Sequence, residues 1–237
     1  FDLPIAISLL LAYGALRAEV GKTVFLGELA LNGELRPVTG VLPALISARD
    51  KGYTDFIVPK ANEREAGYIH GIRVYAPASL RETVDHLSGL KPLSPVPAAE
   101  FSSQERDGKK IYDLSFVKPV AKRALEVAAA GGHNILFVGP PGSGKTMLAR
   151  ALPSILPDLS FDEALQITKI HSVAGTLGEE GIVTQRPFRT PHHTATTVSL
   201  CGGGNKTVHP GEISLAHGGV LFLDELPEYN RSALEAL

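Results

Sequence analysis

The chain has 237 residues, of which 44% are hydrophobic and 20% are charged, and its formal net charge at neutral pH is −2. These values exclude a disordered or fibrous protein, and the small net charge excludes a general basic surface for binding nucleic acid. The single cysteine, Cys201, excludes an internal disulfide framework and indicates a reducing compartment, which we take to be the cytoplasm.

The first strongly apolar run covers residues 3–15. Pro4 and Gly14 interrupt it, and it is shorter than the roughly 20 residues that a membrane-spanning helix needs. It also lacks the basic leader of a signal peptide. We therefore expect a buried helix and no membrane segment. The chain begins at Phe1 and stops at Leu237 inside a helical pattern, so we expect a piece of a longer protein.

After this run, short strand patterns alternate with helix patterns as far as residue 90. The expected helices cover 41–51 and a segment from the capping box at Ser79 to about residue 87. Asn32-Gly33 is a hairpin signal. The expected strands cover residues 23–26, 28–31, 56–58 and 73–75. This alternation predicts an α/β or α+β domain.

The composition then changes to a stretch rich in proline, serine and charged residues without any periodicity. Such a stretch is typical of a linker. We therefore divide the chain into a first domain (1–90), a linker (91–112) and a second domain (113–237).

The second domain is predicted to be a P-loop α/β domain with a parallel sheet. The predicted elements are a helix over 121–130 that ends at two glycines, a strand over 135–138, a helix over 147–152, a helix from the capping box at Ser160 to about 170, a strand over 219–223 and a helix from 230. Residues 171–211 are rich in Gly, Thr, His and Pro, and we interpret them as a functional insertion.

Residues 139–146 read GPPGSGKT and match G-x-x-x-x-G-K-[ST] at every fixed position. The glycines let backbone N–H groups turn around a phosphate, Lys145 would reach the β- and γ-phosphates, and the Thr146 hydroxyl would bind Mg²⁺. A plain glycine-rich turn is the alternative, but the expected strand before the loop and helix after it favour ATP binding. The candidate site residues are Gly139, Pro140, Pro141, Gly142, Ser143, Gly144, Lys145 and Thr146.

Residues 219–225 read GVLFLDE, four apolar residues followed by two carboxylates. A buried parallel strand would deliver Asp224 and Glu225 to the sheet edge where ligands of α/β proteins bind. Asp224 would hold Mg²⁺ and Glu225 would polarise the water that attacks the γ-phosphate, so Lys145, Asp224 and Glu225 are the candidate catalytic residues. A surface Asp-Glu pair is the alternative, which the complete P-loop upstream disfavours.

Four phrases in residues 121–237 resemble the AAA+ module of magnesium-chelatase-like ATPases, in particular the ComM/YifB branch. These are GGHNILFVGPPGSGKTMLARALPSILP, IHSVAG, RPFRTPHHTATTVSLCGGG and PGEISLAHGGVLFLDELPEYNRSALEAL. The phrases FDLPIAISLLLAYG and GELALNGELRPVTGVLPALISARDKGYTDFIVPKANERE resemble the Lon-protease-type domain that precedes that module. The resemblance implies an ATP- and Mg²⁺-dependent motor that forms a ring, expected to be a hexamer, and moves DNA in recombination or natural transformation by branch migration.

Two departures from these families bear on activity. The resemblance places Asp2 where Lon-type peptidases carry their serine nucleophile and Leu42 where they carry their lysine, so we expect the fold without the peptidase. Relatives carry a Gly-Gln segment before the helix over 121–130, which residues 116–121 lack. We expect this difference to alter binding of the adenine base but not binding of the phosphates.

Two other functions stay open beside the DNA motor: a chelatase-type subunit that drives metal insertion, and an ATP-dependent Lon-like peptidase. The resemblance also implies that an arginine from a neighbouring subunit and the sensor residues would follow Leu237. We therefore expect this chain to bind ATP but to hydrolyse it poorly.

Several histidines and basic residues lie in the predicted insertion. A metal site at His192 and His193 is an alternative, but their spacing matches no zinc pattern, so we favour loop hydrogen bonds or subunit contacts. The resemblance places 202–206 in a hairpin that faces a central pore, where Lys206, with Arg186 and Arg189, would contact DNA phosphates. A solvated loop is the alternative.

Overall fold

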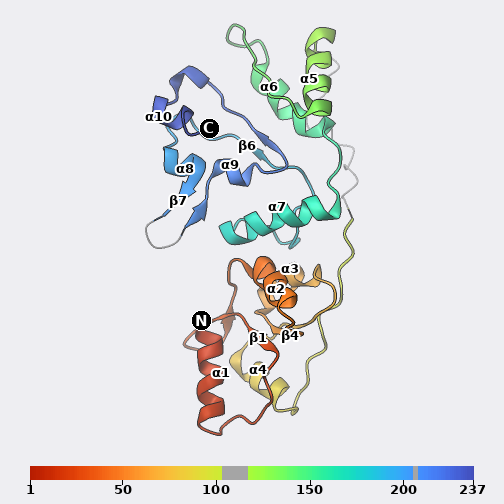
Figure 1. The fold of residues 1–237 in the computed structure, drawn as a ribbon, viewed down its shortest axis with the longest axis vertical. Helices are drawn as coiled ribbons and strands as arrows, with labels where there is room; N and C mark the ends of the chain where they lie inside the picture. Colours follow the sequence, from red (N-terminus) through yellow and green to blue (C-terminus); the bar gives the residue numbers. More distant parts are fainter. Residues whose placement is uncertain (103–116, 205–207) are drawn as a thin grey trace. The chain divides into compact units, whose positions relative to one another are not determined.

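The computed structural model describes residues 1–102, 117–204 and 208–237. The chain folds into two compact units (Figure 1). The first contains Phe1–Phe101 and Thr168–Val183, and the second contains Ser102–Ile167 and Thr184–Leu237. Each unit therefore includes residues that lie apart in the sequence.

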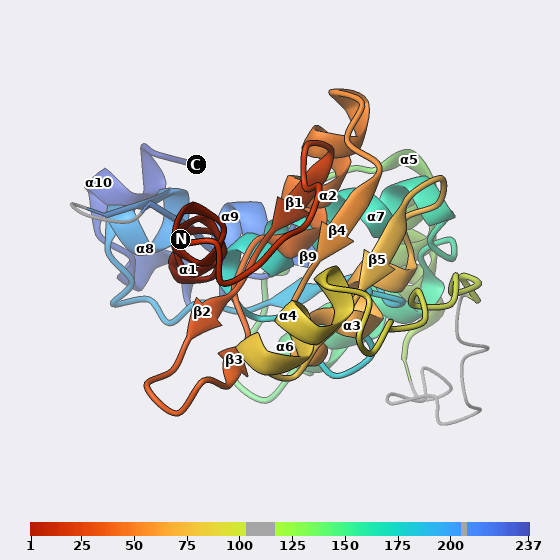
Figure 2. The same cartoon turned by 90° about the horizontal axis from the view of Figure 1, so that it is seen from below.

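A three-stranded parallel sheet forms the centre of the first unit. Its strands are β1 (Thr23–Phe25), β4 (Asp55–Ile57) and β5 (Arg73–Tyr75), in the order β1-β4-β5, and Figure 2 shows them side by side. The guanidinium of Arg73 donates to both carboxylate oxygens of Asp55 on the neighbouring strand, at 2.7 and 2.8 Å. The three strand patterns in the sequence are confirmed to within two residues.

The helix α1 (Asp2–Ala12) buries one face only. Leu3 and Ile7 are fully buried and belong to one core cluster with Leu35 and Ile57. The opposite face leaves large side chains exposed, at Phe1, Ile5, Leu9 and Tyr13. The expectation of a buried helix is therefore wrong for half of its surface. Because apolar residues occur on both faces of this helix, their spacing in the sequence does not show which face is buried.

A short turn that contains Asn32-Gly33 connects β2 (Glu28–Leu29) with β3 (Leu35–Arg36), which pair antiparallel. Gly33 adopts φ +86°, a conformation that glycine reaches without steric cost. The hairpin signal is confirmed.

The remaining helices of the first unit are α2 (Val41–Asp50), η1 (Lys60–Asn62), α3 (Glu63–Gly67) and α4 (Leu80–Leu87). The Ser79 hydroxyl caps α4 by accepting the Glu82 N–H at 3.2 Å, which confirms that helix start. After α4, the Val96 N–H bonds the Val74 carbonyl at 2.7 Å and the Ala99 N–H bonds the Gly67 carbonyl at 2.9 Å. Residues 91–101 of the predicted linker therefore lie along the first unit, and 103–112 lie outside the described residues.

The helices α5 (Pro119–Gly131), α6 (Lys145–Ala151) and η2 (Leu152–Ile155) of the second unit pack around one small core. The helix α7 (Phe161–Ala174) follows them in the sequence. Gly132 ends α5 with φ +62°, as the glycine pair in the sequence predicts. The core cluster consists of Leu125, Leu148 and Leu152 with Ile135, Phe137 and Val220 packed against them, among other side chains.

The strand predicted over 135–138 does not form in this structure. Ile135 and Phe137 pack into the core, whereas Leu136 and Val138 are 72% and 87% exposed. The side chains thus alternate between packed and exposed, as in a strand, but the backbone does not pair with another strand among the described residues. Because β9 (Val220–Leu221) pairs only with β6 (Phe188–Arg189) in the described part of the chain, segment 135–138 has no strand to bond with.

The parallel pair β6-β9 confirms the α/β class for the second unit. The rings of Phe188 and Phe222 stack with their centroids 6.1 Å apart beside this pair. The predicted irregular region contains short elements: α8 (Thr197–Cys201), the antiparallel pair β7 (Gly202–Gly203) and β8 (His209–Pro210), and then α9 (Glu212–Leu215). The chain ends with η3 (Leu226–Glu228) and α10 (Arg231–Leu234). Within the described residues, none of the helices has the length and apolar character needed to cross a bilayer.

A reciprocal capping box begins α7. The Glu163 N–H donates to the Ser160 hydroxyl at 3.3 Å, and the Glu163 carboxylate accepts the Ser160 N–H at 2.9 Å. Arg186 also donates to this carboxylate, at 3.0 Å. The Ser160 backbone bond, then Arg186 and the Ser160 hydroxyl, lower the pKa of Glu163 to about 2.

This lowered pKa predicts a stability loss in acid. Because the folded-state pKa lies below the unfolded value, the contribution of Glu163 is complete above about pH 4.5 and disappears as the pH falls towards 2. The side chain is 46% exposed, so we expect only about 1 kcal/mol. Urea unfolding of Glu163→Gln should therefore show a deficit at pH 7 that shrinks by pH 3. Glu126→Gln, which removes an exposed ion pair with Arg123 at 3.1 Å, is the control and should show almost no deficit. A deficit at Glu163 that does not change with pH would contradict the assignment.

Candidate functional site

The backbone of residues 139–146 forms an open loop that leads into α6. Gly142 and Gly144 adopt φ +76° and +84°, which residues with a Cβ rarely adopt. The Ser143 N–H bonds the Pro140 carbonyl at 3.3 Å, and the Leu148 N–H bonds Gly144 at 3.0 Å at the start of the helix. Of the two glycines that the motif requires, Gly144 therefore has a conformational reason, and Gly142 at a variable position has the same one.

The Lys145 ammonium folds back onto this loop. It donates to the carbonyl oxygens of Gly139 at 2.8 Å and Pro140 at 2.9 Å. These bonds hold the cation against the loop that is expected to bind phosphate. A phosphate oxygen carries far more negative charge than a carbonyl, so it would compete successfully for the same ammonium protons.

Thr146 and Asp224 meet although 78 positions separate them in the sequence. The Thr146 hydroxyl donates to one carboxylate oxygen of Asp224 at 3.0 Å. The other oxygen accepts the N–H of Glu225 at 3.1 Å, so the carboxylate is held in one orientation. A hydroxyl and a carboxylate at this spacing are oxygen ligands of the kind that Mg²⁺ prefers, and the residues present therefore fit the ion.

Glu225 has an unusual backbone conformation. Its φ of +53° is the only positive value at a non-glycine residue among the described residues. Such a conformation costs about 1 kcal/mol or more, and it occurs often at functional sites. The carboxylate lies 3.6 Å from Nδ1 of His193, and its side chain is 68% exposed. Glu225 therefore follows directly after Asp224, the candidate Mg²⁺ ligand, and His193 is close enough to hold its carboxylate.

His193 and Tyr229 support the site in ways that sequence motifs did not reveal. Tyr229 donates its hydroxyl proton to the Pro191 carbonyl at 2.7 Å. Burial, and to a smaller extent the Asp224 charge, raise the pKa of Tyr229, so the phenol keeps the proton that it donates. His193 drew attention in the sequence only as a metal ligand. Its position after β6, which is parallel to the strand before Asp224, is the signal that would have placed it near Glu225.

The neighbouring His192 makes local contacts. Its Nδ1 lies 2.8 Å from the Thr194 hydroxyl, and its ring lies 4.0 Å from the ring of His193. These are the loop hydrogen bonds that we favoured over a metal site. Within the described ranges, no three His, Cys, Asp or Glu side chains are grouped in a way that could hold a metal ion.

Arg186 and Arg189 have structural partners. Arg186 donates to the carbonyls of Pro157 at 2.7 Å and Gly218 at 2.8 Å, in addition to Glu163. Arg189 forms a bidentate pair with Glu212 at 2.6 and 2.8 Å. Both guanidinium groups are therefore engaged, and the expectation that they contact DNA phosphates has no support here. Lys206 lies outside the described residues.

Asp2 and Leu42, which the resemblance aligns with a peptidase dyad, have ordinary structural contacts. Leu42 is fully buried in the core of the first unit. An oxygen of Asp2 accepts the Leu29 N–H at 3.4 Å, beside the hairpin. Neither residue can serve as nucleophile or base in the way that the Ser-Lys chemistry requires.

Two family models and several curated proteins match this chain. The family model described as "Magnesium chelatase, subunit ChlI" matches residues 113–237, and one described as "Subunit ChlI of Mg-chelatase" matches residues 1–62. The chain is 45% identical to the competence protein ComM of Haemophilus influenzae over 242 residues, which cover 100% of this chain and 47% of that protein.

Two further relatives match this chain with similar identity and coverage. The YifB protein of Escherichia coli is 45% identical over 241 residues, covering 100% of this chain and 46% of YifB. A protein of Mycobacterium tuberculosis is 45% identical over 218 residues, covering 91% of this chain and 42% of its own length. The chain thus spans less than half the length of these curated relatives. It belongs to the magnesium-chelatase-like family that includes ComM and YifB.

Proposed function

We propose that this chain binds ATP together with Mg²⁺ and forms part of an AAA+ ATPase that hydrolyses it. The observation that carries this proposal is the contact of Thr146 with Asp224 at 3.0 Å. It brings the end of the P-loop and the end of the acidic strand to one point, where the phosphates of a nucleotide and their metal ion would meet. The family membership supports the same activity.

Each residue would have a separate role. The backbone N–H groups of residues 139–146 would bind the phosphates, and Lys145 would neutralise charge on the β- and γ-phosphates. Bound Mg²⁺ would supply further neutralisation of the developing charge. Glu225 would orient and deprotonate the attacking water, for which an exposed carboxylate is suited.

A test of the metal site uses the 237-residue chain itself. Asp224→Asn removes the charge that attracts Mg²⁺ but keeps the shape of the side chain. We expect Mg²⁺ to tighten binding of a fluorescent ATP analogue about tenfold in the original chain, because the ion would screen the phosphates, and to have almost no effect in the variant. Asp162→Asn, which changes a carboxylate in the first turn of α7, is the matched control. An equal Mg²⁺ effect in Asp224→Asn would overturn the assigned metal role.

We further propose that the longer protein is a ring-forming motor, expected to be hexameric and cytoplasmic, that acts on DNA in recombination or natural transformation. The name of one relative, a competence protein, supports this substrate. Arg186 and Arg189 are engaged in ion pairs, so we assign the DNA contact to Lys206, which lies outside the described residues.

The second candidate is a chelatase-type subunit that drives metal insertion, which the descriptions of the matching family models favour. ATP hydrolysis by the longer protein distinguishes the two. We expect branched DNA to stimulate hydrolysis several-fold, because a motor couples turnover to its track, and we expect porphyrin with Mg²⁺ to leave it unchanged. The Lys145→Ala form is the blank for contaminating ATPases. Stimulation by porphyrin alone would favour the chelatase function and overturn the DNA motor.

A further inference from the structure

The segment Thr168–Val183 connects two parts of the chain in an unusual way. In the sequence it lies between the P-loop and the acidic pair, yet it packs within the first unit. The helix α7 starts in the second unit and ends in the first, since Ile167 belongs to one and Thr168 to the other. One continuous helix is therefore shared by both units.

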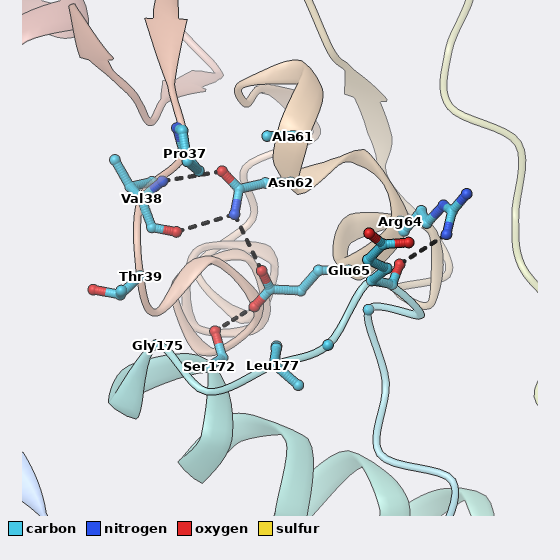
Figure 3. A pocket seen from close by; sticks show the side chains of 13 residues that line it. Pro37, Val38, Thr39, Ala61, Asn62, Arg64, Glu65, Ser172, Gly175 and Leu177 are labelled. Carbon is cyan, nitrogen blue, oxygen red and sulfur yellow. Dashed lines mark hydrogen bonds between the residues drawn. The ribbon is translucent and has the colours of Figure 1, made fainter.

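A buried carboxylate anchors this segment. Glu65 is 6% exposed, and its Oε1 accepts the Leu42 N–H at 2.9 Å and the hydroxyl proton of Ser172. Its other oxygen accepts the Asn62 side-chain amide at 3.4 Å. Figure 3 shows the Glu65 carboxylate between Asn62 and Ser172. Because an ionised carboxylate is very costly to bury without donors, the Ser172 hydroxyl from the segment adds to the donors that Leu42 and Asn62 supply.

Backbone contacts add to this anchor. The Gly40 N–H donates to the Ser172 carbonyl at 3.0 Å, and Nη1 of Arg64 donates to the Glu179 carbonyl at 3.0 Å. Gly181 lies so close to α3 that a Cβ there would come within 2.5 Å of the Glu65 nitrogen, and its φ is +75°. The close approach and the backbone angle both require glycine at this position.

A hollow lies beside these residues, and the chain itself, rather than a ligand, supplies hydrogen-bond partners to the buried polar side-chain atoms there. It has a volume of about 300 Å³, and Asn62, Glu65 and Ser172 line it (Figure 3). Among the described residues, every buried side-chain nitrogen and oxygen already has a hydrogen-bond partner. The buried polar side-chain atoms beside the hollow are thus satisfied by the chain itself.

We propose that Glu65, Ser172 and Gly181 form a joint, called here the Glu65 joint, through which nucleotide binding at the P-loop is coupled to the first unit. The coupling element is α7. Arg186 bonds Glu163 in the first turn of this helix and also the Gly218 carbonyl, which lies just before β9, the strand that leads to Asp224. A displacement or ordering of the first half of α7 is then passed along its hydrogen-bonded backbone to Ser172. The coupling rests on the proposed ATP binding, whereas the joint does not.

Hydrogen exchange of the whole 237-residue chain without nucleotide tests the joint. Ser172→Ala removes a hydrogen bond to a buried charge, so the amides of Gly40 and Leu42 should exchange about tenfold faster or more. Gly181→Ala should do the same through steric conflict. Gly178→Ala, in the same loop, has no neighbour within 4 Å of the added methyl group and should change nothing. The Val58 amide, bonded to Tyr75 at 3.0 Å in the sheet, reports whether the unit stays folded. Unchanged exchange at Gly40 and Leu42 in both variants would overturn the joint.

The same measurement with ATP and Mg²⁺ tests the coupling. In the original chain, exchange should slow in residues 139–146 and also at Gly40 and in residues 168–183. In Gly181→Ala, only the slowing in 139–146 should remain. Protection of 139–146 without any change at Gly40 in the original chain would overturn the coupling. Absence of protection at 139–146 would instead overturn the proposed ATP binding and the coupling with it, while the measurement without nucleotide still decides on the joint.

Discussion

Replacement of Lys145 by alanine should lower the affinity of this chain for ATP about 100-fold or more. The ammonium lies within 2.9 Å of two carbonyl oxygens that line the loop, so it is positioned before the nucleotide arrives. Bonds of a charged donor to phosphate oxygens are among the strongest in proteins, and the loss of two or three of them costs several kcal/mol. Titration calorimetry with ATP and Mg²⁺ measures the change directly.

The control for this prediction is Lys51→Ala, which removes one exposed positive charge at the end of α2. It should leave the affinity for ATP within about twofold, because an exposed distant charge is screened by salt. Thermal unfolding of Lys145→Ala should match that of the original chain, since the ammonium bonds only loop carbonyls. An affinity for ATP within threefold of the original value would show that the P-loop does not bind phosphate.

Local signals in the sequence predicted the parts of this structure that depend on neighbouring residues. The Ser160 and Glu163 capping box, the helix end at Gly132 and the hairpin at Asn32-Gly33 are all confirmed. Each of these involves hydrogen bonds or dihedral angles within a few positions of the chain, so composition and spacing suffice to identify them. The contact of Thr146 with Asp224 was expected as well, because each motif has a known place at the edge of a parallel sheet.

Predictions that depended on residues far apart in the sequence were less accurate. The strand over 135–138 was wrong because its apolar alternation describes two faces but does not provide a strand to pair with. The anchoring of Ser172 by Glu65 was invisible in the sequence, where 107 positions separate the two residues. No local pattern distinguishes a glutamate that is buried by a distant serine from one on a solvated helix face.

The sequence and the structure each contribute to the interpretation of Glu225. The sequence identified it as the candidate base, but only the structure shows its positive φ and its contact with His193 at 3.6 Å. A residue held in a costly conformation beside a metal site is more easily explained by function than by folding. The strain and the neighbour together suggest that the position of this carboxylate is controlled, so that turnover depends on more than the presence of Glu225.

Replacement of Gly219 by alanine should destabilise the second unit by about 3 kcal/mol and lower its unfolding temperature by about 5–10 °C. A Cβ on Gly219 would lie 2.0 Å from the carbonyl oxygen and 2.8 Å from the nitrogen of Pro187. These are backbone atoms, so the conflict cannot be relieved by a side-chain rotation. The next residue, Val220, donates its N–H to the same Pro187 carbonyl at 2.8 Å, and the added methyl group would therefore separate β9 from β6.

This separation links stability to the nucleotide site, because β9 leads directly to Asp224 and Glu225. If the pairing of β9 with β6 positions the metal ligand, then the Gly219→Ala form that remains folded at low temperature should also lose the Mg²⁺ effect on ATP binding. Gly21→Ala, where the added methyl group meets nothing within 4 Å, should change neither property. Loss of stability with an intact Mg²⁺ effect would show instead that the Thr146–Asp224 contact survives without this strand pairing, and that the acidic pair is held by the turn at η3.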